Sequence, residues 1–290
     1  MEGLIQLIIG AFVVASELAL LAAGFGLIFY VTQTFHFVHG AVFLAGGYGA
    51  VVASNWLGIP VVFSLLLGVL TAVLFGVCTE RFLYRPFRRI GATHLAIFIV
   101  SLGALIILES VYEIIFGAEA SVISNNFKTR IYTRGLIVFT NIDCLAVGLA
   151  LFACLAVIFY LHYSPTGRLI RAVANNPELA ETFGIESSRF FLLAFAIGSG
   201  MAGLAGCIHI IRGGLSPLMG AEAVLFGAII AFLSGIGKIG GAALGAFLLA
   251  VCMNLGIWKL PGQWQHTIAF GVLFLVMILK PEGVFAGRKS

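Results

Sequence analysis

The sequence has few charged residues for its length. Of its 290 residues, 10% are Asp, Glu, Lys or Arg, whereas 61% are hydrophobic before its 36 glycines are counted. Soluble domains carry about 25% charged residues, so this chain lacks the polar surface needed to cover an apolar core in water. The mean hydropathy is +1.12. These figures exclude a disordered chain, a fibrous protein and an ordinary soluble enzyme, and they indicate a polytopic membrane protein.

Other signals are missing as well. The five cysteines stand alone in apolar stretches, without a CxxC pair or a metal-ligand spacing, so we interpret them as packing residues. The net charge of +4 does not indicate nucleic-acid binding, because Lys and Arg are scattered among short loops between apolar runs. The first apolar run has neither a basic leader nor a clear cleavage site, and we expect it to be retained as a helix.

Nine apolar stretches follow one another along the chain. They cover approximately residues 4–30, 37–53, 60–79, 93–116, 142–162, 190–211, 221–234, 240–258 and 266–279. A helix needs about 20 residues to cross a hydrocarbon core of about 30 Å, so the shortest stretches predict broken or re-entrant segments. Uninterrupted runs such as Val61–Leu70 lack the alternation of a membrane β-barrel. We therefore predict an all-α polytopic membrane protein with eight to ten transmembrane helices, forming one domain over residues 1–290.

Lys and Arg are distributed unevenly between alternate loops. One set of loops holds eleven of them, near Arg81–Arg89, Arg168–Arg189, Lys238 and Lys280–Lys289, and the other set holds five. The positive-inside rule places the first set in the cytoplasm. With nine crossings, the N-terminus then lies outside, the C-terminus lies inside, and residues 117–141 form the largest external loop.

Small residues recur at intervals of four in two places. These rows are Gly198, Ala202 and Gly206, and then Gly237, Gly241 and Gly245. Small residues let helix backbones approach closely in lipid, so both rows predict packing faces.

The least membrane-like internal stretch with helix signals is SPTGRLIRAVANNPELAETFGIESSR, residues 164–189. Asn176 is a good N-cap, and Gly184 can close a helix in the left-handed conformation. We predict two short helices lying across the cytoplasmic surface. Leu179 and Phe183, four residues apart, would share an exposed apolar face. Such helices can merely connect two spans, or they can dock a cytoplasmic partner.

Five stretches resemble, in the same order, motifs of the branched-chain amino acid ABC transporter permease family. They are FHFVHGAVFLAGGYGA (residues 35–50), ERFLYRPFRR (80–89), GRLIRAVANNPELAETFGI (167–185), SGIGKIG with the GAALGAFLLA after it (234–250), and the closing FLVMILKPEGVFA. The resemblance covers almost the whole chain. Two positions depart from the pattern: His36 stands where asparagine is usual, and Asn175 where aspartate is common.

The resemblance implies an ABC importer permease fold in a bacterial or archaeal cytoplasmic membrane. The implied partners are a second, related but different permease, two cytoplasmic ABC ATPases and an external solute-binding protein. The solute would be a branched-chain or other neutral amino acid, an amide or urea. The chain has no GxxxxGK[ST] motif, so we expect it to be no enzyme and to bind no cofactor or metal, with ATP and Mg used by the partner ATPases.

The resemblance also makes residues 164–189 a cytoplasmic coupling loop. Partner ATPases that close on ATP would push on this loop, and the helices would rock to admit solute. The residues predicted to couple are Gly167, Arg168, Arg171, Ala172, Asn176, Pro177, Leu179, Ala180, Phe183, Gly184 and Ile185.

Polar groups and backbone breaks inside the apolar stretches are the remaining candidates. Irregular backbone at membrane depth is tolerated where it faces protein or a water-filled cavity. The candidates for the translocation path are therefore His36, His39, Gly40, Gly46, Gly47, Tyr48, Gly213, Gly214 and Ser216, with packing as the alternative for the glycines. The break at residues 213–217 is comparable with that near residue 40 and suggests a weak inverted repeat. His36 and His39 indicate a polar kink rather than a zinc site.

Three intramembrane carboxylates, Glu17, Glu109 and Glu222, are costly to bury without a partner. Interhelical hydrogen bonds are the structural explanation for Glu17 and Glu109. A proton-coupled secondary transporter, which would use such carboxylates as relays, is the alternative function. A passive channel is a third hypothesis, and it would conduct solute without any ATPase.

Overall fold

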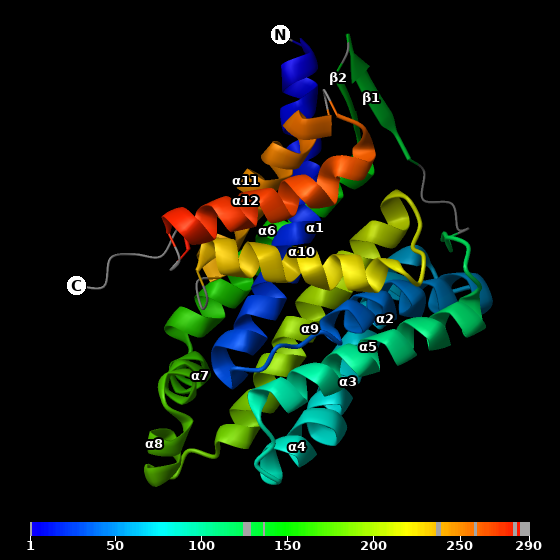
Figure 1. Ribbon diagram of the computed structural model, residues 1–290. Helices are drawn as coiled ribbons and strands as arrows, with labels where there is room; N and C mark the ends of the chain where they lie inside the picture. Colours follow the sequence, from blue (N-terminus) through cyan, green and yellow to red (C-terminus); the bar gives the residue numbers. More distant parts are fainter. Residues whose placement is uncertain are drawn as a thin grey trace.

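The computed structural model describes residues 2–123, 129–135, 137–235, 239–257, 260–280 and 283–284, and most of them are helical (Figure 1). The helices are α1 (Glu2–Thr32), α2 (His39–Val51), α3 (Val61–Cys78), α4 (Arg85–Arg89), α5 (His94–Phe116), α6 (Asn141–Tyr163), α7 (Pro165–Asn175), α8 (Pro177–Thr182), α9 (Ser187–Arg212), α10 (Met219–Ser234), α11 (Ile239–Ile257) and α12 (Gln265–Leu279). Two π-helical turns, η1 (Val52–Trp56) and η2 (Thr79–Tyr84), extend α2 and α3, and a 3-10 turn, η3 (Gly262–Trp264), precedes α12. Five cations used to predict orientation, Lys128, Lys238, Lys259, Arg288 and Lys289, lie outside the described residues.

Six segments of the described chain are long and apolar enough to cross a membrane: Gly3–Thr32, Val61–Arg89, His94–Phe116, Asn141–Tyr163, Ser187–Arg212 and Gly262–Leu279. Met219–Ser234 and Gly240–Gly256 are shorter apolar helices. The predicted number of eight to ten transmembrane helices is therefore not confirmed. Helix α2 has 13 residues, which gives a length of about 20 Å and leaves it short of a hydrocarbon core of about 30 Å.

Helices α1 and α9 form the centre of the bundle, and α5, α6 and α12 lie at its periphery. Within the most apolar window of each helix, 61% of α9 is buried, against 22% of α5 and of α6 and 11% of α12. The peripheral helices expose large apolar side chains, such as Ile114, Phe152 and Phe274, which a soluble protein would cover. This distribution is that of a multi-pass membrane protein, in which lipid covers the outer faces.

Glycine contacts allow the central helices to cross closely. A Cβ added to Gly24 of α1 would lie 2.5 Å from the carbonyl oxygen of Gly198 in α9, and one added to Gly198 would lie 2.7 Å from that of Gly24. Gly40 at the start of α2 and Gly220 at the start of α10 face each other in the same reciprocal way. An inverted repeat, with α1–α2 matching α9–α10, would produce such reciprocity.

Glycines of both predicted rows of small residues lie at contacts between helices. Gly198 packs on α1, and a Cβ on Gly206 would overlap the carbonyl oxygen of Phe43 in α2, so the first row is a packing face. In the second row, a Cβ on Gly245 would overlap the hydroxyl of Ser234, which places α11 against α10. Gly237 lies outside the described residues.

The predicted helical fold is confirmed, and a short antiparallel hairpin is an addition to it that was not predicted. Strands β1 (Ile131–Arg134) and β2 (Ile137–Thr140) pair with Ile131 opposite Thr140, inside the stretch predicted as a loop at 117–141. Side-chain amide atoms of Gln6 in α1 bond the backbone of Val138 in both directions, at 3.1 and 2.8 Å. The hairpin and the start of α1 thus lie together at one end of the molecule, here named the hairpin end (Figure 1).

Helices α4, α7 and α8 lie at the opposite end (Figure 1). The segment of residues 164–186, which contains α7 and α8, is here named the elbow. It follows α6 and leads directly into α9, so the elbow is continuous with one of the two central helices.

Candidate functional site

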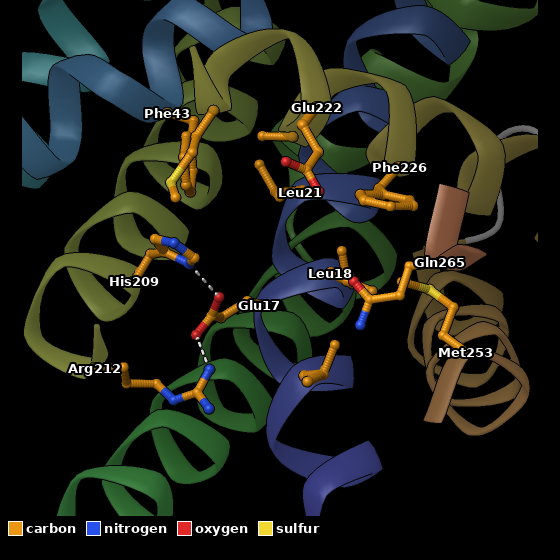
Figure 2. Close-up of a pocket in the computed structure, with 13 residues that line it drawn as sticks. Glu17, Leu18, Leu21, Phe43, His209, Arg212, Glu222, Phe226, Met253 and Gln265 are labelled. Carbon is orange, nitrogen blue, oxygen red and sulfur yellow. Dashed lines mark hydrogen bonds and ion pairs between the residues drawn. The ribbon is translucent and has the colours of Figure 1, made fainter. Parts of the chain in front are cut away.

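A cavity of about 270 Å³ opens between helices of both halves of the chain (Figure 2). It is lined by Val14, Glu17, Leu18, Leu21, Phe43, His209, Arg212, Met219, Glu222, Ala223, Phe226, Met253 and Gln265. These residues come from α1, α2, α9, α10, α11 and α12. Most of the lining is apolar, and Figure 2 shows polar groups on two opposite sides of it. Pockets for drug-sized ligands measure about 300–1,000 Å³, so this cavity suits a small solute.

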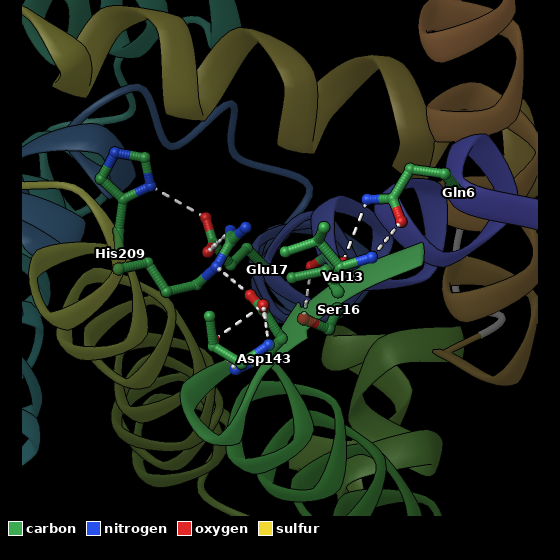
Figure 3. Close-up of polar contacts among 9 residues, drawn as sticks. Gln6, Val13, Ser16, Glu17, Asp143 and His209 are labelled. Atoms are coloured by element: carbon green, nitrogen blue, oxygen red, sulfur yellow. Dashed lines mark hydrogen bonds and ion pairs between the residues drawn. The ribbon is translucent and has the colours of Figure 1, made fainter. Parts of the chain in front are cut away.

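On one side of the cavity, Glu17 joins three helices through an ionic network (Figures 2 and 3). Its carboxylate accepts hydrogen bonds from His209 Nδ1 at 2.9 Å and from Arg212 Nη1 at 2.5 Å. Arg212 Nε also donates to the carboxylate of Asp143 in α6, at 3.2 Å. The side chain of Glu17 is only 10% exposed, so its charge depends on these partners.

On the other side, Glu222 stands in the first turn of α10 and pairs with His266 of α12. The distance from the imidazole Nε2 to the carboxylate is 3.2 Å, and the two side chains are 50% and 44% exposed. Gln265, the residue before His266, also lines the cavity (Figure 2). Glu222 therefore differs from Glu17, because its side chain is 44% exposed and that of Glu17 is 10% exposed.

Glu109 has a structural partner. One of its carboxylate oxygens accepts a hydrogen bond of 2.6 Å from the backbone nitrogen of Ala221, in the first turn of α10. Its side chain thus satisfies one of the unpaired donors of that helix. The predicted interhelical hydrogen bonds are present for both Glu17 and Glu109.

The two histidines of the first glycine-rich motif are fully buried in helix contacts. The Nδ1 atom of His36 lies 2.9 Å from the hydroxyl of Tyr84, and Nε2 of His39 lies 3.2 Å from the carbonyl oxygen of Leu21. His36 lies in the turn before α2, and His39 is the first residue of α2. No cluster of three or more metal-ligating side chains occurs in the part of the chain that the structure describes.

The other candidates in α2 pack against α9, α10 and the α9–α10 break. A Cβ on Gly40 would overlap Gly220, one on Gly46 would overlap Gly203, and one on Gly47 would overlap the Leu215 side chain. The Tyr48 hydroxyl donates to the carbonyl oxygen of Leu215 at 3.0 Å. Of the described residues in α2, Phe43 lines the cavity, and the four candidates on the same helix do not.

Gly213, Gly214 and Ser216 form the break between α9 and α10. Gly214 has a φ of +91°, which favours glycine. Gly213 and Gly214 line a second cavity of about 260 Å³ at the hairpin end, together with Arg212. Ser216 accepts the backbone N–H of Met219 at 3.2 Å and so begins α10.

The elbow is held in one conformation by capping interactions. The Ser164 hydroxyl accepts from Gly167 N at 2.8 Å, and the Asn176 side chain accepts from Leu179 N at 2.9 Å, as predicted for a cap. Pro165 and Pro177 occupy the first positions of α7 and α8. Gly184 closes α8 with a φ of +77°. The sequence signals for the two helices are therefore confirmed.

One face of the elbow is anchored and the other projects. Ile170 and Val173 are fully buried, and a Cβ on Gly167 would overlap carbonyl oxygens of α6. Arg171 donates to the Leu161 carbonyl oxygen. The remaining predicted coupling residues divide between buried Ala180, partly buried Ile185, and exposed Arg168, Ala172, Asn176, Pro177, Leu179, Phe183 and Gly184. Leu179 and Phe183 are 54% and 77% exposed, which leaves an apolar pair at the tip.

A buried ion pair stands beside the elbow, and the sequence did not single it out. Glu80 in η2 is fully buried and accepts from Arg88 of α4. The Arg88 guanidinium also lies 4.9 Å from the ring centre of Phe191, near the start of α9. A cavity of about 730 Å³ separates Arg88 from Pro177 and Glu178 of the elbow. The pair thus ties α4 to the helix that the elbow leads into.

The residues of the cavity that Glu17 and Glu222 line were predicted in part. Glu17 and Glu222 were singled out as intramembrane polar groups, but Arg212 was only counted as a loop cation. His209 and Arg212 lie three residues apart and share a helix face, which is the one local signal that they act together. Nothing in the sequence connects Glu222 with His266.

Comparison with known proteins agrees with this architecture. Residues 7–278 match the family described as branched-chain amino acid transport system / permease component. The high-affinity branched-chain amino acid transport system permease protein BraD of Pseudomonas aeruginosa is 28% identical, over 97% of this chain and 95% of its own. LivH of Escherichia coli, with the same description, is 27% identical over 93% and 91%.

A solved structure supports the fold. A chain in the structure "PsaBC from Streptococcus pneumoniae in complex with Fab" superimposes with a TM-score of 0.51 at 13% identity, over 94% of this chain and 91% of that one. At this identity the likeness concerns the fold alone. Since the family match covers nearly the whole sequence, the chain belongs to the branched-chain amino acid transport permease family and is a multi-pass membrane permease of the ABC transporter class.

Proposed function

We propose that the chain is the transmembrane permease subunit of an ABC importer and forms the path for a small amino-acid-like solute. The solute class comprises branched-chain and other neutral amino acids, amides and urea. The cavity between α1, α9, α10 and their neighbours supports this proposal, because it is small, mostly apolar and provided with polar groups on two sides. BraD and LivH are named as branched-chain amino acid permeases, which agrees with this class.

The observation that carries the proposal is the shape of the elbow. Its base is buried against α6 and its tip exposes Leu179 and Phe183. Leu179 lies within α8 and Phe183 directly after it, so both are held by the Asn176 cap and the Gly184 closure. A rigid segment that leads into a central helix can transmit a push, whereas a flexible loop cannot. We assign the elbow, with the coupling residues predicted from the sequence, to contact with a partner ATPase.

The proposal includes the orientation predicted from the distribution of Lys and Arg. The elbow end faces the cytoplasm, and the hairpin end faces outward, where an external solute-binding protein would deliver solute. The N-terminus is then outside and the C-terminus inside. The complete importer contains a second, related permease and two cytoplasmic ATPases, which bind ATP and Mg, in a bacterial or archaeal cytoplasmic membrane.

Transport proceeds by alternating access around the cavity. The ATPases move the elbow, α9 moves with it, and the ionic network of Glu17 and Arg212 carries that movement to α1 and α6. Helices α2 and α10 tilt about two hinges, the backbone breaks at residues 33–38 and 213–218. The predicted path residues lie in or beside these hinges: those of α2 follow the first, and Gly213, Gly214 and Ser216 form part of the second.

The test removes the exposed pair. Burial of a Leu or Phe side chain contributes about 1.5–3 kcal/mol, so replacing both Leu179 and Phe183 with Ser weakens ATPase binding by well over tenfold. ATP-driven uptake in proteoliposomes falls with it. Ile114→Ser is the matched control, since Ile114 is 84% exposed on α5, away from the elbow. Equal ATPase binding and uptake in the double variant and the control would contradict the proposal.

A further inference from the structure

We infer that Glu222 receives the ammonium group of the solute, so that the cavity takes ammonium-bearing solutes in preference to urea and short amides. The inference rests on the proposed function and narrows its solute class. It also assigns recognition to the permease itself, at a residue within the cavity.

Glu222 is the available carboxylate of the cavity lining. Its side chain is 44% exposed, and its ion-pair partner His266 is itself 50% exposed. Glu222 lines the cavity from the first turn of α10, so a solute in the cavity can reach its carboxylate.

The other carboxylates near the cavity are already occupied. Glu17 is 10% exposed and holds both His209 and Arg212. Glu109 accepts the backbone N–H of Ala221. A cation entering the cavity would have to displace a guanidinium from Glu17, whereas at Glu222 it meets a half-exposed carboxylate without such a partner among the described residues.

The opposite side of the cavity complements the rest of an amino acid. Arg212 lines that side, where it is bonded to Glu17 and Asp143 and supplies the guanidinium of the described lining (Figure 2). Between the two sides, Leu18, Leu21 and Phe226 provide an apolar wall for an aliphatic side chain. Urea and neutral amides offer neither charge to this arrangement.

The experiment uses four probes that share the isobutyl side chain of leucine: L-leucine, 3-methylbutylamine, 4-methylpentanoate and 4-methylpentanamide. Dissociation constants are measured by saturation-transfer NMR on the purified permease–ATPase complex without binding protein. A hydrogen bond between charged groups is lost in Glu222→Gln, so leucine and the amine bind about 10- to 100-fold more weakly. Binding of the amide is unchanged, and the carboxylate probe, which Glu222 repels, binds no more weakly than before. Glu113→Gln removes an exposed carboxylate of α5 outside the cavity lining and changes none of the four.

His266→Gln gives a second measurement that leaves the carboxylate in place, and this variant keeps the preference for the two ammonium compounds. The inference is overturned if Glu222→Gln weakens all probes alike or none, if no probe binds, or if the preference disappears in His266→Gln. Failure here is separable from failure of the proposed function, since ATP-driven uptake by the wild-type complex and its dependence on Leu179 and Phe183 are measured independently.

Discussion

Gly184 offers a sharp test of whether the shape of the elbow matters. Its φ is +77°, and a Cβ placed on it would meet nothing within 4 Å. A substitution is thus opposed by backbone conformation and not by crowding. The left-handed conformation costs a residue with a Cβ about 1–2 kcal/mol, which is a factor of about 5 to 30 in population. Asparagine adopts this conformation far more readily and serves as the matched control.

Two backbone hydrogen bonds depend on this conformation, Gly184 N to Glu181 O at 3.0 Å and Ile185 N to Ala180 O at 3.1 Å. Gly184→Val favours conformers that lack them and that displace Phe183. We expect uptake per ATP hydrolysed to fall about 5- to 30-fold, with normal membrane insertion, and Gly184→Asn to stay near wild type. The assay is uptake and ATP hydrolysis in the same proteoliposomes. The reasoning is refuted if the Val and Asn variants couple equally well.

Two further predictions concern the stability of the bundle, measured by thermal unfolding in detergent. Gly206→Val forces α9 away from Phe43 of α2 and lowers the unfolding free energy by about 1–3 kcal/mol. The control is Gly213→Ala, where a Cβ would meet nothing within 4 Å, and it changes the unfolding free energy little. Equal losses of unfolding free energy in the two variants would contradict close packing at Gly206. Arg212→Met leaves Glu17 short of its cationic partner and costs about 3–5 kcal/mol. Adding Glu17→Gln to Arg212→Met recovers most of the lost unfolding free energy. If the double variant is no more stable than Arg212→Met, the buried charge of Glu17 is not the cause of the loss.

Local signals in the sequence predicted the helices well. The stretches expected at 93–116, 142–162 and 221–234 became α5 (His94–Phe116), α6 (Asn141–Tyr163) and α10 (Met219–Ser234), because apolar length and capping residues act within a few turns. The same holds for the elbow, where Asn176 and Gly184 act as predicted. The hairpin was missed although the runs IYTR and IVFT, rich in β-branched and aromatic residues, flank Gly135, which has a φ of +63°.

The cavity could not be predicted in the same way. Glu17 and Arg212 are 195 positions apart, and Glu222 and His266 lie on different helices. Their pairing depends on how α12 packs on α10 and on how α1 crosses α9, where Gly24 and Gly198 allow a close approach. Small residues predict that a face packs but not what it packs against. Polar residues in apolar stretches were correctly marked as candidates, yet their partners followed only from the three-dimensional arrangement.

The central claim is that this chain provides the route through the membrane while separate ATPases, engaged at the elbow, supply the energy. The most direct test compares proteoliposomes containing the permease pair alone with proteoliposomes that also contain the two ATPases, with binding protein and labelled L-leucine outside and ATP inside. The account predicts accumulation against a gradient only when the ATPases are present. Accumulation by the permeases alone, or ATP-independent passage of leucine through them, would contradict it.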